Sequence, residues 1–197
     1  VTTAAEGDTS DTFTGGTGNE TFVGGSGPDT IKSFTGAAPD AGSHFVLGED
    51  GAIDFNGGLP VSITAIEGVF DGVDLITTGN GVDVVSAGGS NDTITTNGAN
   101  DDIDGGSGND FVSGNGDNDE LFGQTGDDHL DGGQGEDQLD GGAGSDILEG
   151  GQGDDSLGGG SENDTYVFNQ GDGSDDISEF GNAADIDTIV FGADITA

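Results

Sequence analysis

The sequence contains no cysteine, and this absence excludes two common ways of holding a small protein together. Neither disulfides nor thiolate-bound zinc can support the fold, although secreted proteins with a small core usually rely on such a link. Tryptophan and methionine are also absent, and only 29% of the residues are apolar. An ordinary hydrophobic core is therefore hard to assemble from this chain.

Positive charge is almost absent as well. Lys32 is the single basic side chain among 197 residues, against 40 acidic ones, so the formal net charge is -39. A nucleic acid or an anionic membrane would be repelled, because phosphate binding needs clustered lysine and arginine. High charge with few apolar residues is typical of a disordered chain. We therefore expect no nucleic-acid partner, and we expect hard cations to stabilise any folded state.

Long apolar runs and catalytic motifs are missing too. No run approaches the roughly 20 residues that span a bilayer, so we expect no membrane insertion by this segment. The sequence begins with neither methionine nor a signal-peptide pattern of a basic start and an apolar stretch, so we expect Val1 to be a processing boundary or the first residue of an expressed fragment. The sequence has no GxSxG, HExxH or GxxxxGK motif, and His44 and His129 lack a catalytic partner set. The sequence therefore predicts that this chain is not an enzyme.

Glycine is abundant, with 43 residues, and much of it recurs with a period of nine. From Val69 to Val167 the chain divides into eleven consecutive nonapeptides without an insertion. The sixth position is always aspartate, namely Asp74, Asp83, Asp92, Asp101, Asp110, Asp119, Asp128, Asp137, Asp146, Asp155 and Asp164. The eighth is always apolar, namely Ile76, Val85, Ile94, Ile103, Val112, Leu121, Leu130, Leu139, Leu148, Leu157 and Tyr166. A fixed short period of this kind indicates a repeat architecture.

The chemistry of one unit follows from its residues. Glycine at positions one, two and four permits sharp turns and positive φ, so that carbonyl oxygens can point to a common centre. The aspartate adds a carboxylate to that centre. Ligands that are all oxygen suit Ca²⁺ better than Mg²⁺ or a transition metal. The last three residues, such as 111–113, form a strand too short to stand alone.

Stacking of the units makes such strands stable. If two nonapeptides form one turn of a coil, each strand pairs with the strand two units further along the chain, and the position-eight side chains fill a thin core. Each glycine-rich turn then lies over the glycine-rich turn two units further along, with oxygen-lined gaps between them. The sequence thus predicts an all-β solenoid with Ca²⁺ in those gaps.

The motif GGxGxDxUx, with U apolar, resembles the repeats-in-toxin (RTX) or haemolysin-type calcium-binding nonapeptide, and is matched fully at Gly24, Gly105, Gly132, Gly141 and Gly150. The resemblance implies a right-handed parallel β-roll with calcium between successive turns. The segments 163–180 and 187–191 resemble the capping end of such rolls. The family also implies type I secretion from a Gram-negative bacterium, and we expect the export signal, which usually follows the cap, to be missing after Ala197.

The resemblance further implies the ligands. Each site takes the carbonyls of positions two and four and the position-six aspartate from one turn. It is completed by the carbonyls of positions one and three and the aspartate of the unit that lies two units further along the chain. The first set of carbonyl donors comprises Gly79, Gly81, Gly88, Gly106, Gly108, Gly126, Gly133, Gly135, Gly142 and Gly144, and the second comprises Gly123, Thr125, Gly132, Gln134, Gly141, Ala143, Gly150, Gln152, Gly159 and Ser161. Eleven units leave nine gaps.

Three further units begin at Glu6, Gly15 and Gly24. By the same resemblance they suggest one more site, with Gly7, Thr9 and Asp11 from one turn and Gly24, Ser26 and Asp29 from the next. The expected total is therefore about nine or ten Ca²⁺ ions.

Some repeats depart from the motif. Position four is Ser90, Ala99, Asp117 or Glu162 in four of them, and position two is Phe70, Asn97, Asn115 or Gln124 in others. We expect carbonyl ligation to survive there only where the backbone angles survive. Acids outside position six, such as Asp127, Asp154, Glu136 and Glu149, are interpreted as solubilising charge. Phe168, Phe180 and Phe191 are expected to pack the end of the roll, with stacking on sugars as the alternative.

The expected organisation has four parts. Residues 1–32 hold the first repeats, 33–68 an excursion without the motif, 69–167 the main roll and 168–197 the cap. The excursion contains strand-like alternation at 44–47, 52–55 and 61–66. We expect the coil to continue there with wider, calcium-free turns. A specialised binding insertion is the alternative.

These features predict a calcium-induced folding module of a secreted protein, disordered without calcium and rigid with it. One alternative is a calcium-dependent adhesin or surface-layer segment that binds a polysaccharide or a cell surface. Another is the non-catalytic accessory module of a secreted protease, lipase or alginate epimerase.

Overall fold

The computed structural model consists of strands joined by short turns. It describes residues 72–178, 185–193 and 195 in full, and the backbone alone of seven strands before them. Those seven are β1 (Thr2–Thr3), β2 (Thr12–Thr14), β3 (Thr21–Val23), β4 (Asp29–Lys32), β5 (His44–Val46), β6 (Gly51–Asp54) and β7 (Ser62–Thr64). The others are β8 (Asp74–Thr77), β9 (Val84–Ser86), β10 (Thr93–Thr95), β11 (Asp102–Ser107), β12 (Phe111–Gly116), β13 (Glu120–Thr125), β14 (His129–Gln134), β15 (Gln138–Ala143), β16 (Ile147–Gln152), β17 (Ser156–Ser161), β18 (Thr165–Phe168), β19 (Asp176–Ile177) and β20 (Thr188–Phe191).

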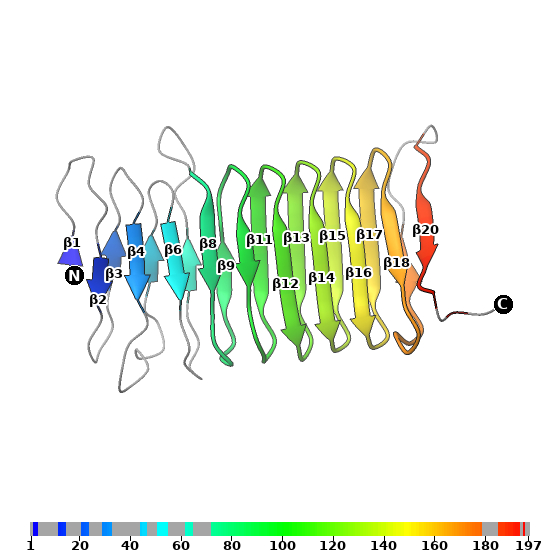
Figure 1. The fold of residues 1–197 in the computed structure, drawn as a ribbon, viewed down its shortest axis with the longest axis horizontal. Helices are drawn as coiled ribbons and strands as arrows, with labels where there is room; N and C mark the ends of the chain where they lie inside the picture. The colour runs from blue at the N-terminus through cyan, green and yellow to red at the C-terminus, as the bar shows by residue number, and fades with distance from the viewer. Residues whose placement is uncertain are drawn as a thin grey trace.

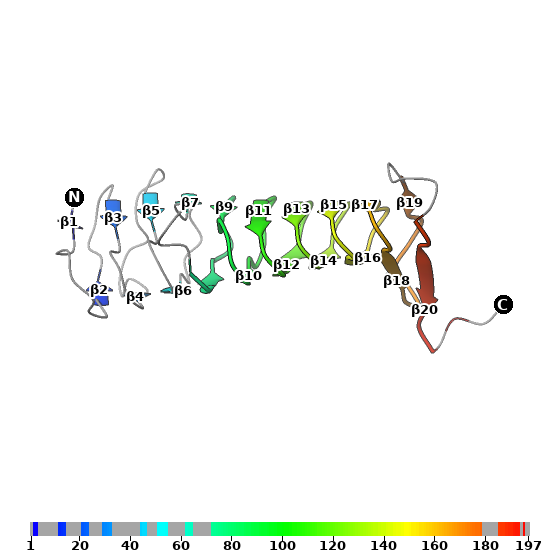
Figure 2. The same ribbon diagram turned by 90° about the horizontal axis from the view of Figure 1, so that it is seen from above.

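The strands form two parallel sheets that face each other. All odd-numbered strands lie in one ten-stranded sheet and all even-numbered strands in the other, in sequence order. Figure 1 shows the strands side by side along one axis, and Figure 2 shows the two sheets on opposite sides of that axis. Along the main roll each residue pairs with the equivalent residue two units later, as Leu130 does with Leu148. The chain is therefore a β-solenoid of the β-roll type, and the predicted fold class is confirmed.

The hydrophobic core is a single file of side chains between the sheets. It contains Ile76, Val85, Ala87, Ile94, Ile103, Val112, Leu121, Leu130, Leu139, Leu148, Leu157 and Tyr166. All but Ala87 are the position-eight residues of the repeat, because successive side chains of a strand point to opposite faces and only this one points inward. Each turn thus contributes little more than two apolar side chains, so the core alone is a weak source of stability.

The coil continues through the excursion with wider turns. Strand β5 pairs with β3 and β7, and β6 pairs with β4 and β8, all in parallel. Asp29 is opposite Gly51, and Gly51 is opposite Asp74, so each of these turns takes up more of the chain than two nonapeptides do. The strand register therefore confirms that the coil continues here with longer turns than in the main roll. The turns themselves lie outside the described residues, and the division of the chain at 32, 68 and 167 stays a prediction.

Two further observations concern surfaces. In the part of the chain that the structure describes, no helix is long and apolar enough to cross a membrane. On the outer face of the even-numbered sheet, the half-buried ring of His129 meets the ring of Phe111 edge to face, with centroids 5.0 Å apart. His129 therefore packs against the residue directly opposite it on the neighbouring strand.

Candidate calcium sites

The position-six aspartates form two buried ladders along the edges of the roll. All eleven, from Asp74 to Asp164, are at most 3% exposed. The backbone N–H of each aspartate donates to Oδ1 of the aspartate one turn later, at 2.7–3.0 Å from Asp74 through Asp164. The carboxylate side chains therefore lie inside the turns, where the sequence predicts the calcium ions.

The second carboxylate oxygen of most of these residues has no hydrogen-bond donor. Oδ2 is buried without a partner in Asp101, Asp110, Asp119, Asp128, Asp137, Asp146, Asp155 and Asp164. A buried charged oxygen without compensation costs several kcal/mol. The chain has one lysine, no arginine and two histidines, so it cannot supply enough positive groups to pair with them. The ladder therefore fits a cation taken from solution.

Backbone carbonyls from the next turn converge on the same oxygen atoms. A Cβ atom placed on Gly132 would lie 2.5 Å from Oδ2 of Asp137 and 2.7 Å from the carbonyl oxygen of Gly150. The corresponding points at Gly123 and Gly141 also lie between an aspartate Oδ2 and a carbonyl of the following turn. A carboxylate and a position-one carbonyl thus meet in the same gap, in a space that only glycine leaves open.

The other carbonyls also point into the gaps. A Cβ atom on Gly142 or Gly144 would overlap the carbonyl oxygen of Gln124 or Gly126, respectively, so the carbonyls of positions two and four point toward the following turn. The position-three carbonyl points back, because Gly126 N–H donates to the Ala143 oxygen at 2.8 Å. A carbonyl oxygen has a second lone pair, so this hydrogen bond does not prevent ligation.

In the turns that begin at Gly123, Gly132 and Gly141, oxygen atoms of both turns thus face the same gap, which fits the arrangement that the resemblance implied. Several carbonyls with one or two carboxylates suit a large cation with flexible coordination, which describes Ca²⁺ rather than the strictly octahedral Mg²⁺. The ligand set of each ion stays a prediction.

Burial and mutual repulsion disturb the ionisation of the ladder. Burial raises the pKa of Asp119 to about 7, the N–H of Asp101 lowers it, and the charges of Asp101 and Asp137 in adjacent turns raise it further. Burial likewise raises the pKa of Asp146 to about 7, and those of Asp101, Asp110 and Asp137 to about 6. Without a cation, the folded ladder therefore disfavours its own charged form.

Most departures from the motif keep the turn geometry. Ser90, Ala99, Asn115, Asp117, Gln124 and Glu162 all have positive φ, between 68° and 86°. At position four, Gly108, Gly126, Gly135, Gly144 and Gly153 instead adopt φ from 131° to 151°, a region that only glycine enters readily. Asn97 does not share the positive φ, and Phe70 lies outside the described residues. The carbonyls of the six substituted positions can therefore still face the gaps, at the cost of local backbone strain.

The substitution Gly144→Ala should destabilise the calcium-bound roll strongly. Gly144 has φ +138°, and the added methyl group would overlap the carbonyl oxygen of Gly126 in the preceding turn. We expect a loss of about 2 kcal/mol or more of unfolding free energy, read as a lower urea midpoint in calcium. Ala143→Ser, at the exposed neighbouring position, is the control. Equal midpoints for the two variants would show that the turns do not need this close approach.

The structure describes the predicted ligands of the main roll and brings those from Gly106 to Ser161 close together turn by turn, whereas Gly79 and Gly81 lack the positive φ of these turns. Gly79, Gly81 and Gly88 belong to turns whose position one is Thr78 or Ala87, so the open space left by glycine is missing at that position. The predicted N-terminal site, with Asp11 and Asp29, lies outside the described residues apart from the backbone of Asp29 in β4.

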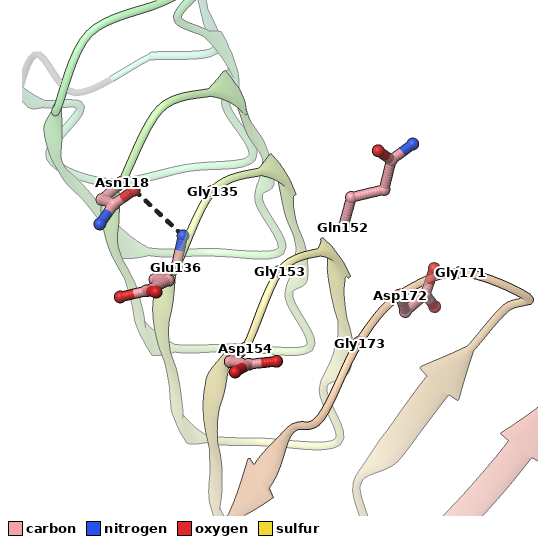
Figure 3. A pocket seen from close by; sticks show the side chains of 9 residues that line it. All are labelled: Asn118, Gly135, Glu136, Gln152, Gly153, Asp154, Gly171, Asp172 and Gly173. Carbon is pink, nitrogen blue, oxygen red and sulfur yellow. Dashed lines mark hydrogen bonds between the residues drawn. The ribbon is translucent and has the colours of Figure 1, made fainter.

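Two further repeat units follow the main roll, but insertions shift them out of the nine-residue period, so the sequence analysis missed them. Asp155 N–H donates to Asp175 Oδ1, 20 residues on, and Asp164 N–H donates to Asp187 Oδ1, 23 residues on. Ile177 pairs with Leu157, and Ile189 with Tyr166, so each follows its aspartate by two positions as in a regular unit. Gly171 and Gly173 have the positive φ of positions two and four. The segment predicted as a cap therefore begins with another repeat after a two-residue insertion. Figure 3 shows Gly171, Asp172 and Gly173 on the turn beside that of Gly153.

A second ladder at position five was also missed. The side chain of Asn118 accepts the N–H of Glu136 at 3.1 Å, and Asp127 accepts that of Ser145 at 2.9 Å. Asp154 does the same for Ser174 at 3.0 Å. Figure 3 shows Asn118 reaching over Glu136 in this way. Asp127 and Asp154, interpreted above as solubilising charge, thus also join adjacent turns, and the recurrence of Asn or Asp at position five was the available signal.

The fold and the gaps define a calcium-binding parallel β-roll. The family model of the RTX calcium-binding nonapeptide repeat, four copies long, matches residues 7–36, 77–112, 113–148, 131–166 and 140–175. Because these matches cover more than half of the chain, it belongs to the RTX calcium-binding repeat family. Searches of the curated proteins and of the solved structures found no match. The RTX β-roll is a structural calcium-binding module.

Proposed function

We propose that this chain is the calcium-driven folding module of a secreted bacterial protein, disordered without calcium and rigid with it. The observation that carries the proposal is the row of buried Oδ2 atoms without a donor, from Asp101 to Asp164. In the absence of cations these carboxylates oppose folding, and the single-file core is too small to offset the ordering of the backbone.

Calcium reverses this balance. About nine ions would bring about +18 charges to a chain of formal charge -39, and each ion would join two turns. The free energy of binding then becomes free energy of folding, as in small metal-dependent domains. Because each turn contacts only its neighbours, folding propagates along the roll.

Secretion is supported by the family and by calcium levels. RTX repeats are typically found in secreted bacterial proteins. Extracellular calcium modules bind with dissociation constants of about 10⁻⁴ to 10⁻³ M, far too weakly to fill in the cytosol. A chain of this kind would stay unfolded inside the cell and fold after export. A module whose role is to fold when it binds calcium needs no catalytic residues, so we expect this chain to have no enzymatic activity of its own.

The test is far-UV circular dichroism of chelator-stripped chain at neutral pH. A titration with CaCl₂ should give a cooperative coil-to-β transition near millimolar calcium, while MgCl₂ at the same concentrations should leave the chain as coil. A chain that is already β-structured in chelator would show that calcium decorates a preformed scaffold, and the proposal would then be wrong.

A further inference from the structure

The C-terminal end of the roll has an oxygen cluster unlike those of the earlier turns. A Cβ atom on Gly159 would touch Oδ2 of Asp164 and, at 2.5 Å, the hydroxyl oxygen of Tyr166. At Gly132 the corresponding point lies between Asp137 Oδ2 and the Gly150 carbonyl oxygen. The tyrosine hydroxyl thus occupies the place that a carbonyl of the following turn occupies in the middle of the roll.

The position of this hydroxyl is fixed from both sides. The ring of Tyr166 belongs to the core, and the side chain is 1% exposed. Gly159 N–H donates to the hydroxyl oxygen at 2.7 Å, although position-one N–H groups earlier in the roll donate to backbone carbonyls, as Thr96 does to Ser113. The hydroxyl therefore replaces backbone groups of the next turn at the point where that turn is displaced.

A cation would complete this cluster. Oδ2 of Asp164 is buried without a hydrogen-bond partner, and Asp164 is 1% exposed. Asp187 approaches from the following turn, with its Oδ1 accepting the Asp164 N–H at 3.0 Å. Gly160 and Glu162 have the positive φ, +102° and +86°, of positions two and four. The neutral phenol oxygen, two carboxylates and backbone carbonyls together form a set of hard oxygen donors.

We propose that Asp164, Asp187 and the Tyr166 hydroxyl hold a further Ca²⁺ ion at the C-terminal end of the roll. This site lies one turn beyond the last gap of the regular repeats, on the C-terminal side. Asp187 lies outside the residues that the family model matches. The proposal rests on the proposed function, because it assumes that the aspartate ladder takes up calcium. It assigns a binding role to the phenol of the last core residue.

Terbium luminescence can test this site because the chain has one tyrosine and no tryptophan. Tb³⁺ binds oxygen ligands like those of Ca²⁺ and emits when a nearby tyrosine absorbs, with an efficiency that falls steeply with distance. Calcium-folded chain titrated with Tb³⁺ should therefore show emission excited through Tyr166. Asp187→Asn should lower this emission at least twofold. The matched control is Asp175→Asn, which changes the equivalent aspartate on the other edge of the roll.

Equal emission from the Asp187→Asn and Asp175→Asn variants would overturn the proposal, as would a calcium-folded parent chain without tyrosine-sensitised emission. In either case circular dichroism would still show calcium-induced folding, so the proposed function would stand. A parent chain that does not fold with calcium would overturn both. As a second measurement, equilibrium dialysis of Tyr166→Phe should count one Ca²⁺ fewer than the parent, whereas a hydroxyl that only accepts the Gly159 N–H would leave the count unchanged.

Discussion

Replacing Asp119, Asp137 and Asp155 together with asparagine should abolish folding at millimolar calcium. The asparagine oxygen can still accept the N–H of the preceding turn, as Oδ1 of each aspartate does at 2.8–2.9 Å. The negative charge that attracts the cation is lost in successive gaps on one edge, so the roll is interrupted where each turn depends on its neighbours. We expect the calcium midpoint in far-UV circular dichroism to rise at least about tenfold, which corresponds to about 1.4 kcal/mol.

The same triple variant should behave in the opposite way in chelator. A buried neutral amide costs less than a buried unpaired carboxylate, so the ion-free roll should be more stable than that of the parent. The control carries Asp102→Asn, Glu120→Gln and Asp140→Asn, which remove the same charge from exposed positions of the outer faces. A control that moves the calcium midpoint as far as the ladder variant would mean that bulk charge, and not the ladder, sets the response.

Acid should partly replace calcium. The pKa of Asp119 and Asp146 is raised to about 7, and that of Asp101, Asp110 and Asp137 to about 6, from 3.8, mainly because the carboxyls are buried. Carboxyls with raised pKa bind protons in the folded state before they do in the unfolded state. Stability of the ion-free roll is therefore gained as the pH falls from about 7 to about 4, and is lost again as the pH rises.

The expected size of this effect is large. A shift from 3.8 to about 6 corresponds to about 3 kcal/mol for one carboxyl, and several carboxyls contribute, although neighbours on one ladder do not add independently. In chelator, circular dichroism should show coil at pH 8 and increasing β-structure toward pH 4, at low protein concentration because the pI is about 4.1. The ladder triple variant should lose part of this transition. A chain that remains coil down to pH 4 would contradict the raised pKa values as a source of instability.

The regular part of this fold follows from the sequence because the repeat is strict. Every nonapeptide has aspartate at its sixth position and an apolar residue at its eighth. This leaves one arrangement, in which Leu130 stacks on Leu148 and Asp128 on Asp146. Insertions break this inference. In the units that contain Asp175 and Asp187, the aspartate follows that of the preceding turn after 20 and 23 residues, and only the hydrogen bonds and strand pairing of the structure restore the alignment.

Backbone strain was the second feature that the sequence did not reveal. Gln124 and Glu162 have positive φ although neither residue type favours it, because the adjacent turns impose the geometry that glycine adopts elsewhere. The role of the Tyr166 hydroxyl was hidden for a related reason. Position eight predicts an inward apolar side chain, and nothing in a period of nine says where the far end of a long side chain will reach.

The aspartate ladder also gives the roll a polarity of growth. From Asp74 to Asp146, the backbone N–H of each position-six aspartate donates to a carboxylate 18 residues later, so this bond of every turn is completed only by the turn that follows it in the sequence. A ribosome, which makes the N-terminal turns first, always leaves the aspartate N–H of the newest turn without its carboxylate acceptor. A chain that begins to order at its C-terminal end instead offers each incoming turn a finished template, so the last residues synthesised are the natural starting point for winding the roll.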